Sequence, residues 1–236
     1  MKENYLGVDV STYNYEQLSS ILMENIDKQK KSFLVAINPE KIMKAQEDEE
    51  LRQLLNRADY QIPDGIGVIL ASKLKKGNIQ SRVTGIDMML TLCDVATKNG
   101  KKIFMYGGKP GVADKAKVEL EKQFPGIQIV GTLNGYEKDE QVIIERINEH
   151  KPDIIFVALG SPTQEYWIVN HMDKVTPMIF QGVGGSYDVI SGNLKRAPEA
   201  FQKMGLEWFY RLIKEPWRFK RQLILPQFLI KVLKNR

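Results

Sequence analysis

The sequence has few of the residues that form disulfides or bind metals, and it has no long apolar run. Its 236 residues include one cysteine and two histidines, and the longest unbroken apolar run is Ile154 to Leu159. One cysteine excludes an internal disulfide, and a helical span needs about 20 apolar residues. We therefore expect neither an export signal nor a membrane span. Cys93, which lies in an apolar helical pattern, is predicted to be a buried thiol.

Common hydrolytic and metal chemistries also lack their motifs. No H-E-x-x-H pair, G-x-S-x-G elbow or Asp-x-Asp triplet occurs in the sequence. Zinc hydrolysis, serine hydrolysis and a divalent-metal clamp for a nucleotide diphosphate are therefore disfavoured. His150 and His171 end amphipathic helical patterns, where we expect solvated imidazoles.

Charge is distributed unevenly along the chain. Residues 195–236 contain 11 Lys/Arg and 3 Asp/Glu, whereas the chain as a whole has a net charge of +5. All the excess positive charge therefore lies in the tail. Such a segment attracts anionic lipid headgroups, diphosphates or nucleic acid, and a solvated basic face remains the alternative.

Short apolar runs alternate with amphipathic stretches over the first 195 residues. This alternation predicts an α/β fold with a Rossmann-like parallel sheet and helices on both faces. The predicted strands are Phe33–Ile37, Lys102–Tyr106, Ile127–Val130, Ile154–Leu159 and Met178–Phe180. The predicted helices are Tyr15–Lys30, Glu47–Ala58, Gly65–Leu74, Asp87–Asn99, Gly111–Gln123, Asp139–His150 and Thr163–Met172. We divide the chain into this core, 1–195, and a basic, aromatic, helical appendage, 196–236, that associates with membranes.

Glycine-rich turns follow several of the predicted strands. Gly182, Gly184 and Gly185 follow one strand, and a missing Cβ lets backbone N–H groups approach a phosphate, although such glycines can also simply turn the chain. Gly107-Gly108 opens a helix as a dinucleotide fingerprint would, but no acidic residue follows the next strand, which makes an NAD-dependent enzyme a poor fit. Ligand contacts are expected at the carboxyl ends of the strands.

Asp64 is the carboxylate that we single out. It stands between Pro63 and Gly65, directly before an apolar helical stretch. Aspartate at this place is typical of a helix N-cap. It also suits a general base beside a glycine-lined hollow, and the sequence leaves both interpretations open.

The tail carries arginines and aromatic residues at helical spacing. Arg211, Lys214, Arg218 and Arg221 recur every three or four residues, so one continuous helix would align them. Arginine forks bind phosphate oxygens in two places, which favours a lipid diphosphate as the ligand. Leu223 to Leu233 is nearly all apolar yet too short to span a bilayer, so we expect it to lie in the interface or to pack on the core or on a second subunit.

Eight segments in order resemble one known family, the WecG/TagA/CpsF glycosyltransferases of wall teichoic acid, enterobacterial common antigen and capsule synthesis. They are INPE (Ile37–Glu40), PDGIGV (Pro63–Val68), RVTGID (Arg82–Asp87), YGGKPGVA (Tyr106–Ala113), FPGIQIVGTLNGY (Phe124–Tyr136), FVALGSPTQEYWI (Phe156–Ile168), GVGGSYDVISGNLKRAP (Gly182–Pro198) and LEWFYRLIKEPWR (Leu206–Arg218). The resemblance covers nearly the whole chain. One departure is Ala36, where the family often has threonine.

The resemblance implies an inverting, metal-independent transfer that needs no cofactor. A hexose derivative, best matched by N-acetylmannosamine, would move from a UDP-sugar to an undecaprenyl-diphosphate-linked sugar, best matched by N-acetylglucosamine, at the inner face of the cytoplasmic membrane. UDP-glucose and UDP-N-acetylmannosaminuronate are alternative donors, and a non-catalytic nucleotide-sugar or lipid-binding protein is an alternative of another class. A nucleic-acid partner is not expected, and the apolar tail leaves self-association open.

The resemblance also implies roles for single residues. By similarity, Asp64 would be the catalytic base, and Asn38 and Gln164 would line the sugar pocket. The other implied residues would contact the nucleotide (Tyr136, Gly184, Gly185 and Asp188) or the diphosphate (Arg82, Arg211, Arg218 and Arg221).

Overall fold

The computed structural model describes residues 1–214 and 223–234 and contains eight strands there. Two of them form an antiparallel hairpin, and six form a parallel sheet in the order β4-β3-β8-β7-β5-β6. The strands are Lys2–Tyr5 (β1), Val8–Ser11 (β2), Ser32–Ile37 (β3), Tyr60–Pro63 (β4), Lys102–Gly107 (β5), Gln128–Leu133 (β6), Ile154–Ala158 (β7) and Ile179–Gly182 (β8). The predicted parallel α/β class is confirmed, as are all five predicted strands.

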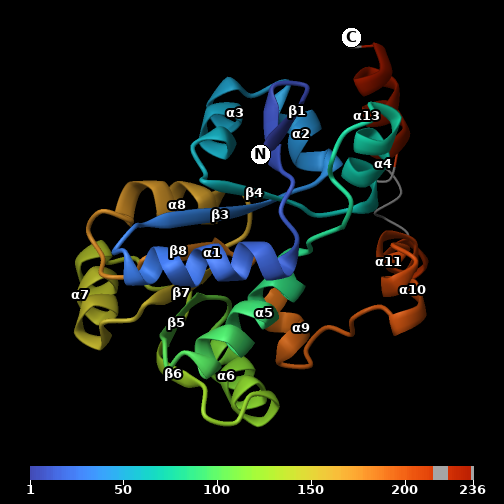
Figure 1. The fold of residues 1–236 in the computed structure, drawn as a ribbon. Coiled ribbons are helices and arrows are strands. Elements are labelled where there is room, and N and C mark those ends of the chain that lie inside the picture. Colours follow the sequence, from blue (N-terminus) through green and yellow to red (C-terminus); the bar gives the residue numbers. More distant parts are fainter. Residues whose placement is uncertain (215–222, 235–236) are drawn as a thin grey trace.

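Helices cover both faces of the sheet (Figure 1). Successive residues of β7 show why: Ile155 packs in one apolar core and Phe156 in the other, as expected for a strand buried on both faces. The helices are Tyr15–Asp27 (α1), Pro39–Ala45 (α2), Glu49–Asn56 (α3), Ile66–Leu74 (α4), Gly85–Lys98 (α5), Val112–Gln123 (α6), Glu140–His150 (α7), Thr163–His171 (α8), Ser186–Ile190 (α9), Glu199–Lys203 (α10), Glu207–Lys214 (α11) and Ile224–Lys234 (α13).

The two cores belong to different sets of helices. α1, α5, α6 and α9 pack with one face of the sheet, and α2, α3, α4, α7, α8 and α13 pack with the other. Cys93 lies on the buried face of α5, as predicted, and this burial raises the pKa of its thiol. An unreactive structural thiol follows from that environment.

Among the elements that the sequence analysis missed, three lie at the N-terminus or beside Asn38 and Asp64. The β1–β2 hairpin turns at Leu6 and Gly7, both with positive φ, as in a type I′ turn. The edge strand β4 escaped notice because it is short and contains Gln61, whose buried amide donates to the carbonyls of Leu55 and Ala58. The third element is α2, which begins after the N-cap Asn38 with Pro39 in its first turn.

The C-terminal helix α13 lies against α2 and α4 (Figure 1). Phe228 and Val232 are buried in the core, whereas Ile230 and Leu233 on the same helix are exposed. Contact is so close that a Cβ on Gly67 would lie 2.5 Å from Leu225 Cδ1. The apolar segment therefore packs on the core with one face and leaves the other uncovered.

Candidate active site

The carboxyl ends of the parallel strands meet at one edge of the sheet, and the predicted site residues follow them. Asn38 follows β3, Asp64 follows β4, Gln164 lies beyond β7, and Gly184 lies beyond β8. β3 is the neighbour of both β4 and β8. The loops after β4, β3 and β8 are therefore adjacent. They lie at the edge where an open α/β sheet usually binds its ligand.

Asp64 is fixed at this edge by its backbone. Its N–H donates to the carbonyl of Ile37 at 2.8 Å, and the next residue, Gly65, has a φ of +105°. Gly65 is the N-cap residue of α4, and no side chain caps that helix. The capping interpretation of Asp64 is therefore wrong, and its carboxylate is available for other contacts.

The surroundings of Asp64 act on its carboxylate in opposite directions. Burial raises the pKa of Asp64 above its ordinary value, while the positive charges of Arg82 and Lys41 and the N–H of Gly85 lower it. Glu207 adds to the upward shift. The result is a carboxyl group whose pKa is raised, as suits a proton acceptor in a partly buried site.

Gly85 brings the start of α5 close to this carboxylate. A Cβ at Gly85 would lie 4.0 Å from Asp64 Oδ2 and 3.5 Å from the Cβ of Ala36. Thr84 is the N-cap of α5. Its backbone N–H donates to the Tyr15 hydroxyl at 2.8 Å, which ties the start of α5 to α1. Ala36 and the Asp64 carboxylate therefore both lie next to the Gly85 position at the start of α5.

Arg82 belongs to a chain of ion pairs that reaches the tail. Its guanidinium binds the Glu207 carboxylate of α11, and Glu207 also accepts from Arg196 Nε at 3.2 Å. Arg196 in turn binds both carboxylate oxygens of Asp87 at 2.7 Å. This bidentate pair lowers the pKa of Asp87, although burial alone would raise it. Arg211 lies one turn after Glu207 on α11, so the helix that carries it docks beside Arg82.

A second chain of contacts connects the sugar-pocket candidates. The side-chain oxygen of Asn38 accepts the Lys41 N–H at 2.9 Å and so caps α2. Lys41 Nζ lies 2.8 Å from Glu165 Oε1, which also accepts from Gln164 Nε2 at 3.1 Å. Gln164 Oε1 accepts the Gly184 N–H at 3.0 Å. The structure therefore brings Asn38, Gln164 and Gly184 together through a charged pair that the sequence analysis missed.

The glycines of the two turns have different structural roles. A Cβ at Gly107, whose φ is +114°, would lie 2.4 Å from the Ala158 carbonyl oxygen. The Gly108 N–H donates to that same carbonyl, and its own carbonyl accepts from Gly135. Gly107 and Gly108 therefore tie the loops after β5 and β6 to the last residue of β7. Gly185, by contrast, has a negative φ and nothing within 4 Å of its Cβ position.

The remaining nucleotide candidates are Tyr136 and Asp188. Tyr136, in the loop after β6, is 63% exposed. Asp188 lies on α9, where its carbonyl accepts from the Leu194 N–H at 2.8 Å. The expectation for His171 is wrong: it is buried and stacks on Trp167 at 4.8 Å, because α8 lies against the sheet.

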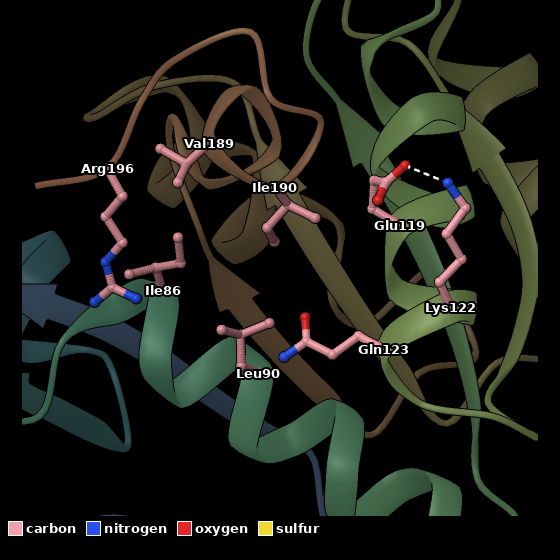
Figure 2. Close-up of a pocket in the computed structure, with 8 residues that line it drawn as sticks. All are labelled: Ile86, Leu90, Glu119, Lys122, Gln123, Val189, Ile190 and Arg196. Atoms are coloured by element: carbon pink, nitrogen blue, oxygen red, sulfur yellow. Dashed lines mark hydrogen bonds and ion pairs between the residues drawn. The ribbon is translucent and has the colours of Figure 1, made fainter. Parts of the chain in front are cut away.

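Two hollows flank the first turns of α5. One, of about 280 Å³, lies between Arg82, Thr84 and Asp87 on one side and Gln202, Met204 and Gly205 on the other. The other, of about 410 Å³, has an apolar wall of Ile86, Leu90, Val189 and Ile190, with Arg196 at one end and the Glu119–Lys122 ion pair across it (Figure 2). Arg82 is the predicted site residue that borders the first hollow, and none borders the second.

Some predictions concern parts of the chain about which the structure says nothing. The side chain of Arg211 and the whole of Arg218 and Arg221 lie outside the described residues. Within 1–214 and 223–234, no three His, Cys, Asp or Glu side chains are grouped so as to hold a metal ion. In the same ranges no helix has both the length and the apolar character to cross a membrane.

Comparison with known proteins agrees with this architecture. The family model described as the glycosyl transferase WecG/TagA/CpsF family matches residues 3–236. Curated relatives from Bacillus spizizenii and Bacillus subtilis (strain 168) are each 40% identical over 210 residues, which is 89% of this chain and 82% of the relative. Both are named N-acetylglucosaminyldiphosphoundecaprenol N-acetyl-beta-D-mannosaminyltransferase. A match of this extent, on a chain whose motif residues gather at one edge of a parallel sheet, shows that the protein belongs to the WecG/TagA/CpsF family of glycosyltransferases.

Proposed function

We propose that this chain transfers N-acetylmannosamine from its UDP-sugar to N-acetylglucosaminyl-diphospho-undecaprenol with inversion at the anomeric carbon. The names of the two Bacillus relatives support the acceptor and the transferred sugar. The position of Asp64 carries the proposal: a half-buried carboxylate of raised pKa, next to Arg82 and Lys41, at the ligand-binding edge of the sheet.

The reaction is a single displacement. Asp64 takes the proton from the acceptor hydroxyl, whose oxygen forms a bond to the anomeric carbon while the bond from that carbon to UDP breaks. Attack from the face opposite UDP inverts the configuration. Asn38 and Gln164 position the sugar, and Tyr136, Gly184, Gly185 and Asp188 hold the nucleotide.

Arginines rather than a metal ion neutralise the diphosphate in this proposal. Arg82 supplies one guanidinium from the core, and Arg211, Arg218 and Arg221 of the tail supply the others. The docking of α11 beside Arg82 supports a site shared by core and tail.

The enzyme acts at the inner face of the membrane, where its acceptor lipid is anchored. Adjacent helices support this: Leu70 and Leu74 of α4 and Ile230 and Leu233 of α13 are exposed apolar residues, and α4 and α13 pack together. Exposed lysines lie among them at Lys73, Lys231 and Lys234. Such a surface suits contact with anionic headgroups, each cation near the bilayer contributing about 1 kcal/mol.

A donor panel tests the reaction and the sugar together. UDP-N-acetylmannosamine, UDP-N-acetylmannosaminuronate and UDP-glucose are each incubated with a short-chain diphosphate-linked N-acetylglucosamine, and UDP release and product mass are measured. We expect release and a matching product with the first donor and in the presence of a chelator. UDP binding without release from any donor would instead indicate a non-catalytic binding protein.

A further inference from the structure

The ion pair between Lys41 and Glu165 is buried beside the candidate active site. The Glu165 side chain is fully buried and that of Lys41 is 14% exposed. Desolvating two charges costs several kcal/mol per ion, and apolar replacements of similar volume are often neutral or stabilising. Folding alone therefore does not call for a charged pair at this place.

Glu165 holds its neighbour Gln164 as well as Lys41. Gln164 Nε2 donates to Glu165 Oε1 at 3.1 Å, and Gln164 Oε1 accepts the Gly184 N–H at 3.0 Å. Both ends of the carboxamide are thereby engaged, which fixes its orientation. There is little room to move, because a Cβ at Gly182 would lie 2.5 Å from Gln164 Nε2.

Lys41 is tied to the turn that carries Asp64. Asn38 caps the Lys41 N–H, and the Asn38 Cβ lies 3.6 Å from the Cβ position of Gly65. The Asp64 N–H donates to Ile37, the residue before Asn38. The first turn of α2 and the turn after β4 therefore form one unit.

The ammonium of Lys41 is one of the charges that act on Asp64. Arg82 and Lys41 favour its ionised form, Glu207 disfavours it, and Tyr15 is a further titratable neighbour. Lys41 is the cation in this group that is also bound to a second, fully buried carboxylate. Any change in that second carboxylate changes how strongly Lys41 acts on Asp64.

We propose that Glu165 and Lys41 are positioning residues of the transferase site, in which Glu165 fixes both the Gln164 carboxamide and the Lys41 ammonium, and Lys41 balances the charge of the base Asp64. The role in turnover rests on the proposed function, because it assumes that Asp64 is the base. The electrostatic coupling itself does not.

Two substitutions should move the protonation of Asp64 in opposite directions. Lys41→Met removes a cation, so Asp64 should ionise at higher pH and the acid limb of kcat/KM should move upward. Glu165→Gln keeps the shape and an acceptor for Gln164 while freeing Lys41 to act on Asp64, so the limb should move downward. We expect each to lower kcat/KM at neutral pH by about 10–100-fold through misplaced substrate groups.

The experiment measures two things on the full chain. UDP release gives kcat/KM against pH for wild type, Lys41→Met and Glu165→Gln. Carbon-13 NMR of the ligand-free protein, with the Asp64 signal assigned by Asp64→Asn, gives the protonation of that carboxyl directly. Lys28→Met, which removes an exposed pair with Glu24, is the matched control and should leave both unchanged.

Opposite shifts of the Asp64 titration in the two variants support the proposal. Equal shifts, or no shift, would overturn it and leave the pair a packing feature. If the wild-type chain releases no UDP from any donor, the proposed function fails, while the NMR titration still decides the coupling. Should Lys41→Met not fold, Lys41→Gln keeps a polar side chain at this partly exposed position and gives the same comparison.

Discussion

The Arg82 guanidinium binds the Glu207 carboxylate and so joins the segment after α4 to a tail helix 125 residues farther along the chain. Glu207 also accepts from Arg196, so one carboxylate lies between two guanidinium groups. Arginine pairs of this kind bind phosphate oxygens as readily as carboxylates. Glu207 therefore occupies the place that an anionic ligand of Arg82 would take.

We expect Glu207→Gln to strengthen binding of inorganic diphosphate. The amide keeps the size of the side chain and removes the competing charge, and a gain of about 1 kcal/mol corresponds to about fivefold in Kd. Isothermal titration calorimetry measures the effect. Arg82→Gln should weaken the same binding, and equal affinities in all three proteins would exclude Arg82 from the diphosphate site.

Asp64→Asn should lose activity while retaining the nucleotide. A missing general base costs about 10²–10⁴-fold in rate, and UDP affinity should stay near that of the wild type. A UDP-release assay should show the slowed reaction, and a binding titration should show a normal Kd for UDP. Wild-type turnover in a folded Asp64→Asn protein would remove Asp64 from the mechanism.

The same substitution should stabilise the fold at neutral pH. Burial raises the pKa of Asp64, so the folded state favours the protonated form, and ionisation costs stability as pH rises through the unfolded and then the folded pKa. Asn has no such cost. Thermal unfolding should show a higher Tm for Asp64→Asn at pH 7.5 and a smaller difference in acid, where each kcal/mol is about 2–4 °C for a chain of this size. A Tm gap that grows toward acid pH would contradict this sign.

Gly185→Ala should separate ligand contact from folding. The negative φ and the open space at Gly185 accept a methyl group, so Tm should change little. UDP binding should weaken if the nucleotide approaches this backbone closely. Gly107→Ala is the contrasting variant: its Cβ would strike the Ala158 carbonyl at a positive φ, and we expect a loss of about 1–3 kcal/mol in unfolding free energy. Normal UDP binding by Gly185→Ala would leave that glycine outside the nucleotide site.

Substitutions at two residues of α13 should affect membrane binding and stability separately. Phe228 is fully buried, so Phe228→Ala should cost about 3–5 kcal/mol in denaturant unfolding. Ile230 is 53% exposed, so Ile230→Ala should leave stability within about 0.5 kcal/mol and reduce sedimentation with anionic vesicles. Undiminished vesicle binding by Ile230→Ala would show that this face of α13 does not contact lipid.

The sequence was sufficient for five of the six strands of the parallel sheet because buried parallel strands carry apolar runs. β7 is an uninterrupted apolar run, and β8 was found from the apolar residues Met178 to Phe180 that precede its buried Gln181. β4 has only four residues and contains a buried glutamine whose partners are carbonyls that the sequence does not reveal. α2 left a usable signal, since Asn38 followed by Pro39 is a helix start. The same asparagine had been considered only for sugar contact.

The sequence predicted the parts of the candidate site that lie in recognisable motifs. It did not predict the ion pairs and contacts between residues that are far apart along the chain. Asp64 was singled out by its place between Pro63 and Gly65 and by the family motif, but its neighbours come from α2, the start of α5 and α11. Glu165 adjoins Gln164 in the sequence, yet nothing in the sequence says that it is fully buried or that its partner is Lys41. Asp87 lay in a quoted motif, and its bidentate partner Arg196 lies 109 residues away.

The packing of α13 on α2 and α4 has a consequence for biosynthesis. The ribosome makes α2 and α4 early, and their outer faces are covered only when α13 has emerged. The turns bearing Asn38 and Asp64 begin those two helices. In a nascent chain the two helices that begin at these turns therefore stay partly uncovered until α13 has emerged and docked.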